Sequence, residues 1–464
     1  MKNLTVIAVL LSVLFASATM AQDVRSITLE EAVEIALENN IDVRLSKNAI
    51  DRSESEYRQN RADFMPNLNV SVGGNRQIGR QFDQATVTFD DFTTTNFNSS
   101  ISTSVTIFDG FRNINELRSS RLGMESAEER YQRTREAIIF ETAALFLDVL
   151  LSQELLEIER ENLEAGRQQL EQVEAQVEVG MRPIVDQYSQ ESVVANNELS
   201  VIQSENALNL NKLRLARILQ LDPLGEFDFV APGIREEEME VRDYNLREMI
   251  QMAMANRSDV RASELELRQS RHALSVSQGA RLPQVSLSAS LSSAYRDRQV
   301  DVDPDTGAPI QGTTMPFSDQ FFDANINRGI GFNVSIPIFN RWQTRNQIQQ
   351  RQIDFRNAEL QLDDLRQEVF LELQQAYNDY TGYAQELEAT ERALIAAERA
   401  YETEQERYNV GSATLIELTN ANNEFVRASS NRVQAMYRFA FQEKVLDFYL
   451  GRITEDVEIE GLTY

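Results

Sequence analysis

The chain contains an internal duplication, and this repeat limits its possible folds more than any other feature of the sequence. The segment "ITLEEAVEIALENNIDVRLS" from Ile27 aligns with "YNLREMIQMAMANRSDVRAS" from Tyr244 at an offset of 217 residues. Beyond a variable segment, an offset of 231 residues pairs Gly180 with Gly411. A repeat that keeps its register on both sides of a variable segment indicates two units of one plan. Each reads as a helix, two strands, a very long helix, a tight turn and a further helix.

The first residues are typical of a secretory signal peptide. Lys2 precedes an almost wholly apolar run from Leu4 to Phe15, and small residues follow as far as Ala21. About a dozen apolar residues are too few to span a bilayer, so we favour a cleaved signal over an N-terminal membrane anchor. We divide the chain into a signal peptide, residues 1–21, a first structural repeat, residues 22–235, and a second structural repeat, residues 236–464.

Each repeat contains two predicted strands, at about residues 67–77 and 98–108 in the first and 284–295 and 329–339 in the second. Apolar side chains alternate with Ser, Thr, Asn or Gly, so one face of each strand is apolar and the other is polar but almost uncharged. In the first repeat the apolar positions include Ile101, Thr103, Val105 and Ile107. In the second repeat they are Val285, Leu287, Ala289, Leu291, Phe332, Val334 and Ile336.

The number and length of these strands point towards an oligomer. Strands of about ten residues match the tilted strands of an outer-membrane barrel, although a hairpin on a soluble protein core also alternates. Four strands cannot close a barrel, since the smallest bacterial outer-membrane barrels have about eight. Open strand edges in lipid would leave backbone groups unpaired. If the strands cross a membrane, several chains must combine with closed cyclic symmetry.

Two predicted helices are unusually long. Proline is absent and glycine is rare from about Phe111 to Val179 and from Arg341 to Val410. Each helix would extend roughly 100 Å at 1.5 Å per residue. Apolar or aromatic residues recur at every seventh position: Val149, Leu156, Leu163, Leu170 and Val177, and Tyr380, Leu387, Leu394, Tyr401 and Tyr408. A strict heptad predicts neighbouring helices in a left-handed supercoil, which is also the pattern of a plain coiled-coil rod.

Composition excludes several classes of function. The formal net charge of −28 argues against a nucleic-acid partner, which would require a basic face. The absence of cysteine excludes disulfides, thiolate metal sites and lipid attachment at a cysteine. The single histidine, His272, follows Arg271 in a helical stretch and is expected to be solvated. We find no phosphate-binding glycine loop and no isolated carboxylate pair, so we expect neither an enzyme nor a resident metal or cofactor.

The loop "DVDPDTGAP" leaves one metal alternative open. Asp301, Asp303 and Asp305 stand in a D-x-D-x-D spacing. A calcium loop would continue with glycine and carry glutamate at its twelfth position, where this chain has Thr306 and Gly312. An ordinary turn at Pro304–Gly307 in an exposed loop explains the same residues.

Taken in order, these motifs resemble the TolC-like outer-membrane efflux family. The resemblance covers nearly the whole mature chain and rests first on the duplicated openings "LEEAVEIALENN" and "LREMIQMAMANR". The strand ends "IFDGFRN" and "IFNRWQTRN" follow, and then the turns "VGM" and "VGS" with "IVD" and "LIE" after them. No single motif is decisive, but their order, present twice, is specific. Members of the family often carry a cysteine for lipidation after the signal, and this chain lacks it.

The resemblance implies an α+β membrane protein of the outer membrane that extends into the periplasm. In such a homotrimer, four strands from each chain close one twelve-stranded barrel, and the helices continue it as a coiled-coil tunnel. The apolar strand faces then contact outer-membrane lipid, and the serines line the lumen. The family implies a passive exit duct of a tripartite efflux or type I secretion system. Its partners are a periplasmic adaptor protein and an inner-membrane transporter that supplies the energy.

The resemblance also assigns the functional residues at the two turns. The adaptor-docking tips are Val179, Gly180, Met181, Val410, Gly411 and Ser412. In the family, acidic residues on the helix after the second tip constrict the periplasmic aperture. Glu417 matches the first of these positions and Asn420 replaces the second acid, while Asp186 is the equivalent of Glu417 in the first repeat. Alternatively, both carboxylates only stabilise the start of a helix.

A soluble periplasmic coiled-coil scaffold or adaptor is the alternative to an exit duct. It would share the heptads and the helical hairpins, but it would not need strands with one apolar and one polar face. Cargo and pump class do not follow from these residues, because drugs, metal ions, siderophores and polypeptides all leave through such ducts.

Overall fold

The structure is a computed structural model that describes residues 25–83, 88–222, 225, 227–230, 242–299, 301, 303, 305–308, 310 and 313–454. The predicted signal peptide, residues 1–21, lies outside the described residues. The chain forms two compact units. The first comprises the described parts of Met1–Asn48, Glu129–Arg261 and Asp364–Tyr464, and the second comprises those of Ala49–Glu128 and Ala262–Asp363. Each unit therefore draws on both predicted repeats.

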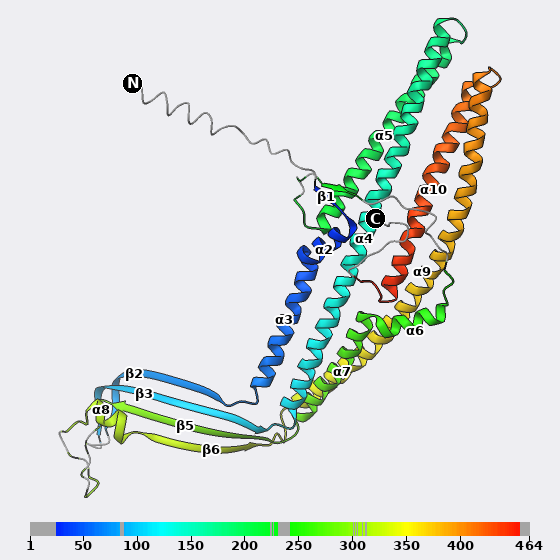
Figure 1. The fold of residues 1–464 in the computed structure, drawn as a ribbon. Coiled ribbons are helices and arrows are strands. Elements are labelled where there is room, and N and C mark those ends of the chain that lie inside the picture. Colours follow the sequence, from blue (N-terminus) through cyan, green and yellow to red (C-terminus); the bar gives the residue numbers. More distant parts are fainter. Residues whose placement is uncertain are drawn as a thin grey trace, which may run out of the picture. The chain divides into compact units, whose positions relative to one another are not determined.

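The main helices correspond in pairs between the repeats (Figure 1). Helices α2 (Leu29–Asn39) and α6 (Leu246–Asn256) each have 11 residues, and α3 (Ile41–Ala62) and α7 (Ser258–Gly279) each have 22. Helices α4 (Arg112–Glu178) and α9 (Gln343–Asn409) have 67 residues, and α5 (Ile184–Ile218) and α10 (Leu415–Tyr449) have 35. The two long helices therefore begin and end within about two residues of the predicted bounds. Among the described residues, no helix carries an apolar stretch long enough to cross a bilayer.

The second unit contains an antiparallel four-stranded sheet with the order β2-β3-β5-β6 (Figure 1). Its strands are β2 (Asn67–Asp83), β3 (Thr88–Phe108), β5 (Gln284–Arg296) and β6 (Asn327–Ser335). The first pair is longer than predicted, because β2 and β3 continue to pair as far as Asp83 and Thr88. Between β5 and β6 lie two short helical elements, α8 (Phe317–Asp319) and η2 (Gln320–Ala324).

Two details of the strands differ from the predicted alternation. A bulge between Thr106 and Phe108 makes Phe108, rather than Ile107, the partner of Val285. Strand β6 ends at Ser335, so Ile336 lies just beyond the strand in which it was predicted. Proline follows Ile336 in the sequence, and a proline has no N–H to continue a ladder.

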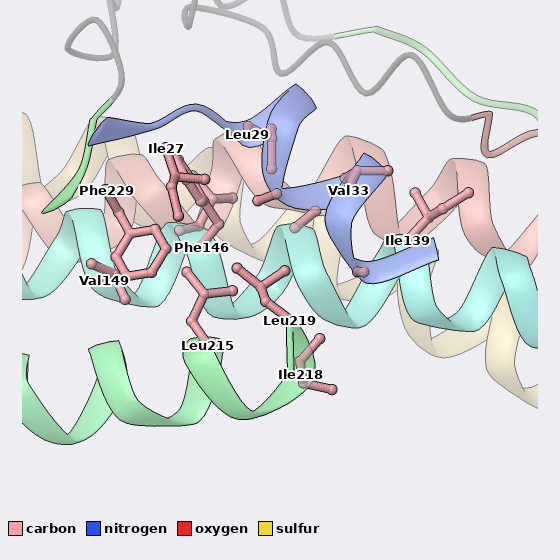
Figure 2. Close-up of a cluster of buried hydrophobic side chains, with 14 of the residues drawn as sticks. Ile27, Leu29, Val33, Ile139, Phe146, Val149, Leu215, Ile218, Leu219 and Phe229 are labelled. Atoms are coloured by element: carbon pink, nitrogen blue, oxygen red, sulfur yellow. The ribbon is translucent and has the colours of Figure 1, made fainter. Parts of the chain in front are cut away.

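The first unit is held together by buried apolar side chains around α2 and α4 (Figure 2). Strands β1 (Arg25–Ile27) and β4 (Phe227–Phe229) form a short parallel pair that contributes Ile27 and Phe229 to this core. The ring of Phe229 meets that of Phe146 edge-on, with 6.1 Å between the ring centres. The predicted heptad seam is buried at half of its positions, Val149, Leu156, Leu163, Tyr380 and Tyr408, and only partly buried at the other five.

A buried ion cluster lies in the same unit. Arg257 is 2% exposed, and its guanidinium lies 2.6 Å from the carboxylate of Asp259 and 2.5 Å from that of Glu372. Arg133 approaches Asp259 to 3.3 Å. Burial alone would raise the pKa of Asp259, but hydrogen bonds from Arg257 and the two arginine charges hold it below its usual value. This carboxylate therefore stays ionised inside the unit.

In the second unit, the backbone crosses itself closely where the sheet joins the helices. Gly110, between β3 and α4, has φ +75°, and a Cβ placed on it would lie 2.3 Å from the carbonyl oxygen of Gly279. A Cβ on Gly279, the last residue of α7, would in turn lie 2.4 Å from the carbonyl oxygen of Gly110. Each glycine thus makes room for the other. At the equivalent junction after β6, Arg341 and Trp342 have positive φ values of 55° and 65°.

Candidate functional site: a two-faced sheet and two helical tips

One face of the sheet is made of small polar residues. Cross-strand partners lie on the same face, so the register defines three successive rows. The rows are Asn67, Ser104, Ser288 and Gly331, then Asn69, Ser102, Ser290 and Gly329, then Ser71, Ser100, Ser292 and Asn327. The hydroxyls of Ser71 and Ser100 are 2.7 Å apart, and that of Ser104 donates to Asn67 Oδ1 at 3.1 Å. This face offers hydrogen bonds without charge and leaves space for water.

The opposite face is apolar over the same length, with Arg328 as the one charged residue of these rows. Its rows are Leu68, Thr103, Ala289 and Ile330, then Val70, Ile101, Leu291 and Arg328, then Val105, Leu287 and Phe332, then Phe108, Val285 and Val334. The structure thus brings six of the seven predicted apolar-face residues of the second repeat together on one surface. Ile330 is 85% exposed, Leu68 72% and Phe332 69%. An exposed apolar surface of this kind usually marks a site of contact with a membrane or with another protein.

Sequence reasoning missed part of this apolar face. Leu68, Val70 and Val72 of β2 belong to it, although only the bounds of that strand were predicted. Their signal was present, because they alternate with Asn67, Asn69 and Ser71.

The two predicted tips are matching helix ends in the first unit (Figure 1). After α4, Gly180 has φ +74° and its N–H donates to Val177 O, while the N–H of Met181 donates to Gln176 O at 2.8 Å. After α9, Gly411 has φ +78° and repeats the pattern with Tyr408 O. Both are Schellman turns, which require a left-handed residue that glycine adopts without strain.

Both tips expose apolar side chains. Val179 is 69% exposed, Met181 76% and Val410 79%. Ile184 and Val185 beside the first tip and Ile416 beside the second are also exposed, and sequence reasoning missed all three. They open the helices that follow the turns, where spacing alone does not distinguish an exposed residue from a buried one. Together these residues give each tip an exposed apolar surface.

Arg182 connects the two tips. Its guanidinium lies over the ring of Tyr408, 3.9 Å from the ring centre, and it donates to Gln176 Oε1 at 2.6 Å. It also forms an ion pair with Asp186 at 3.5 Å. Asp186, a predicted aperture residue, is therefore half-buried and already paired within the chain.

Glu417, the second predicted aperture residue, caps α10. Its backbone N–H donates to the Thr414 hydroxyl, and its carboxylate accepts from the N–H and the hydroxyl of Thr414. The backbone and hydroxyl hydrogen bonds from Thr414 lower the pKa of Glu417, which is fully exposed. Asn420 and Glu424 are also exposed and follow at helical spacing, so the three form one stripe along α10. Sequence reasoning did not single out Glu424.

The calcium alternative finds no support in the described part of the loop. Asp303 Oδ1 accepts the N–H groups of Asp305 and Thr306, which is the geometry of an ordinary Asx turn. Those hydrogen bonds lower the pKa of Asp303. Among the residues that the structure describes, no group of three or more His, Cys, Asp or Glu side chains is placed to hold a metal ion. His272, expected to be solvated, instead lies 3.1 Å from Asn115 Oδ1 and is partly buried.

Sequence comparison shows that the chain is similar to known outer-membrane proteins. A family model described as "Outer membrane efflux protein" matches residues 32–220 and 249–452. The outer membrane efflux protein BepC of Brucella suis biovar 1 (strain 1330) is 23% identical over 458 residues, which cover 98% of this chain and 91% of BepC. The outer membrane protein TolC of Escherichia coli (strain K12) is 21% identical over 333 residues, 70% of this chain and 63% of TolC.

Solved structures share the fold. The CmeC outer membrane channel of Campylobacter jejuni superposes with a TM-score of 0.79 at 16% identity, over 93% of this chain and 87% of CmeC. CusC superposes with a TM-score of 0.78 at 18% identity, over 91% of this chain and 92% of CusC. The fold is thus the one in which strands of a β-barrel are continued by the helices of a tunnel.

Proposed function

Since this chain belongs to the outer membrane efflux protein family, it is a passive efflux channel and not an enzyme, and we propose that it works as a homotrimer. It resides in the outer membrane and extends into the periplasm. Three copies would supply the twelve strands of one closed barrel. The helices of all three would continue that barrel as a coiled-coil tunnel.

The two faces and two free edges of the sheet carry this proposal. Within the described part of one chain, β2 and β6 are each paired with a strand on one side only. An unpaired edge in lipid costs several kcal/mol for each backbone group, so β6 of one copy is expected to pair with β2 of the next. Closure then places the apolar rows against lipid and the rows of serine, asparagine and glycine around a water-filled lumen.

The exposed apolar tips support docking to a periplasmic adaptor protein. Val179, Met181 and Val410 lie on rigid Schellman turns, which hold them in fixed positions. An apolar surface of this kind, rimmed by charged helices, is typical of a protein interface. The adaptor would connect the duct to an inner-membrane transporter, in a tripartite efflux or type I secretion system.

The carboxylates after the tips support an acidic periplasmic aperture. Three copies of Glu417 would face one narrow opening, with Asn420 and Glu424 further along the same stripe. Ionised carboxylates crowded at a constriction attract cations. Asp186 and Glu424 contribute less to this field, because Arg182 and Arg427 neutralise them in the same chain.

The proposal is tested by where the protein fractionates and how it conducts. We expect heat-modifiable trimers in the outer-membrane fraction, and purified trimers should form channels in a planar bilayer. A soluble periplasmic monomer would overturn the duct and favour the coiled-coil scaffold. Trimers that insert into the bilayer but never conduct would overturn only the proposal that the lumen is open, and would leave the trimeric barrel standing.

A further inference from the structure

Strand β5 extends beyond its partner at the end of the sheet remote from the helices. Strand β6 begins at Asn327, opposite Ser292, whereas β5 continues to Arg296. Among the described residues, no strand therefore lies beside the backbone of residues 293–296 on that edge. In a membrane barrel this short length of edge must still satisfy its hydrogen bonds.

Two side-chain amides replace the missing strand. Gln320 of η2 is fully buried, and its amide accepts from the Arg296 N–H at 2.9 Å and donates to the Arg296 carbonyl at 3.0 Å. The amide of Asn325 donates to the Ala294 carbonyl at 2.7 Å. Gln320 and Asn325 thus bind alternate residues of β5, as a neighbouring strand would, and fix α8 and η2 against the sheet.

These elements carry a cluster of aromatic rings onto one particular face. The ring of Phe317 stacks on that of Phe321 at 5.1 Å, and each lies within 6.0 Å of Phe97 of β3. Phe317 also lies 5.1 Å from Tyr295 of β5.

Phe97 and Tyr295 are direct partners in the sheet, and their register places them on the face of Leu287 and Leu291. The Ser293 hydroxyl, on the same face, donates to Phe321 O at 2.5 Å. The cluster therefore continues the apolar face that the proposed barrel turns towards lipid, and not the polar face.

The outer surface of the cluster is uncovered in the single chain. Phe322 is 68% exposed and Phe317 is 44% exposed. Arg76 and Arg328 occupy positions on the same face, Arg328 opposite Leu291 and Arg76 one row beyond Phe97. Exposed aromatic rings flanked by arginines are what the boundary between acyl chains and phosphate headgroups favours.

We propose that the segment Phe317–Ala324 is a lipid anchor that rests in the outer leaflet of the outer membrane. The phenyl rings of Phe317 and Phe322 enter the acyl-chain boundary, and Arg76 and Arg328 reach the lipid phosphates. Gln320 is the positioning residue, because its amide fixes the segment to β5. This inference rests on the proposed function, since that function places the apolar face in lipid.

The single tryptophan makes a direct test possible. In a Trp342→Phe background, Phe322→Trp becomes the only indole in the chain. The protein is reconstituted into phosphatidylglycerol vesicles with brominated acyl chains, and its emission is compared with that in unbrominated vesicles. We expect loss of most of the emission and little quenching by aqueous iodide. Phe317→Trp is the second reporter, in case Phe322→Trp does not fold.

Two further single-tryptophan variants separate this inference from the barrel itself. Leu287→Trp reports on the barrel wall and should be quenched by brominated lipid, whereas Ser290→Trp reports on the lumen and should be quenched by iodide. Quenching by lipid at Leu287 but not at 322 or 317 would overturn the anchor and leave the barrel intact. Lack of lipid quenching at all three positions would overturn the orientation of the sheet, and the anchor with it.

A final variant tests the positioning role of Gln320. Gln320→Ala in the Phe322→Trp reporter removes both amide hydrogen bonds to Arg296. We expect the emission to shift to the red and the lipid quenching to fall, while the same change leaves the Leu287→Trp reporter unaffected. Unchanged quenching of the Phe322→Trp reporter would show that Gln320 does not hold the anchor.

Discussion

Thr414 and Glu417 cap the start of α10 reciprocally: the hydroxyl of Thr414 accepts the Glu417 N–H at 3.3 Å, and the Glu417 carboxylate accepts the Thr414 N–H at 2.7 Å. One carboxylate therefore has two possible roles, as a helix cap and as part of an acidic aperture. The two roles separate experimentally, because the cap needs an acceptor oxygen whereas the aperture needs a charge.

Glu417→Gln tests the aperture, since glutamine can keep the capping geometry and lacks the charge. Combined with Asp186→Asn, it should weaken block by multivalent cations added on the periplasmic side and reduce cation selectivity in single-channel recordings. Thr414→Ala is the matched control. It removes the cap at a cost of about 1 kcal/mol but keeps the charge, so selectivity should stay unchanged. Unaltered block in the double variant would place both carboxylates off the conduction path.

The tips are tested at Gly411, which has a φ of +78° and no atom within 4 Å of a Cβ placed on it. Two substitutions at this position separate the effect of backbone strain from the effect of a bulky side chain on the surface. Gly411→Trp should abolish efflux and adaptor cross-linking, because the indole covers the docking surface. Gly411→Asn should retain both, since asparagine tolerates the left-handed conformation. The sheet belongs to the other unit, so trimers should form in either variant. Normal export by cells carrying the tryptophan variant would contradict docking at this tip.

The two faces of the sheet are tested by one pair of neighbours on β5. Leu287→Arg places a charge on the apolar face and should cost on the order of 2–4 kcal/mol near mid-bilayer. Ser288→Arg points to the opposite face and should cost far less. The yield of heat-modifiable trimers in the outer membrane measures both. Equal yields would mean that the facing, or the barrel, is wrong.

The buried ion cluster predicts a pH dependence of stability in the first unit. The folded-state pKa of Asp259 is below its usual value of 3.8, so the folded protein binds this proton less readily than the unfolded chain does. Its stabilisation is complete above pH 3.8 and is lost as the pH falls through the lower folded pKa. Asp259→Asn should cost about 3 kcal/mol at pH 7, because it leaves Arg257 buried without its bidentate partner. The loss should shrink towards pH 3.

Urea midpoints followed by circular dichroism in detergent measure that loss. Glu388→Gln is the control, because the ion pair of Glu388 with Arg392 is more than 70% exposed on both sides. Exposed pairs contribute little, so this variant should behave as wild type at both pH values. A deficit in Asp259→Asn that stays the same at pH 3 would rule out the charge as its cause.

The sequence predicted the regular parts of the fold well, because each of them follows a regular residue pattern that can be read directly from the sequence. The absence of proline and the seven-residue repeat predicted α4 and α9 to within about two residues. The alternation from Val285 to Leu291 predicted both faces of β5. The matched tip glycines, Gly180 and Gly411, predicted two turns that prove to have the same hydrogen bonds.

What the sequence did not reveal depends on contacts between distant segments. The bulge that makes Phe108 the partner of Val285 arises where two strands fit together, and neither strand signals it alone. The role of Gln320 depends on Arg296, 24 residues earlier, whose backbone N–H and carbonyl pair with the Gln320 amide in place of a neighbouring strand. The capping of α10 by Glu417 could be anticipated from its spacing to Thr414, but the pairing of Asp186 with Arg182 depends on which rotamers the tip allows.

The crossing of Gly110 and Gly279 has a consequence for the symmetry of the assembly. In the trimer proposed above, the same junction recurs between β6 of one copy and α3 of the next. There the repeat offsets of 231 and 217 residues place Arg341 and Ala62 where Gly110 and Gly279 stand. An arginine and an alanine each carry a Cβ, so they cannot approach as closely as the two glycines do. Around the circumference, a narrow seam within each copy would alternate with a wider seam between copies. In the proposed trimer, the duplication would therefore give a ring that is sixfold only in outline, with three narrow seams within copies and three wider seams between them.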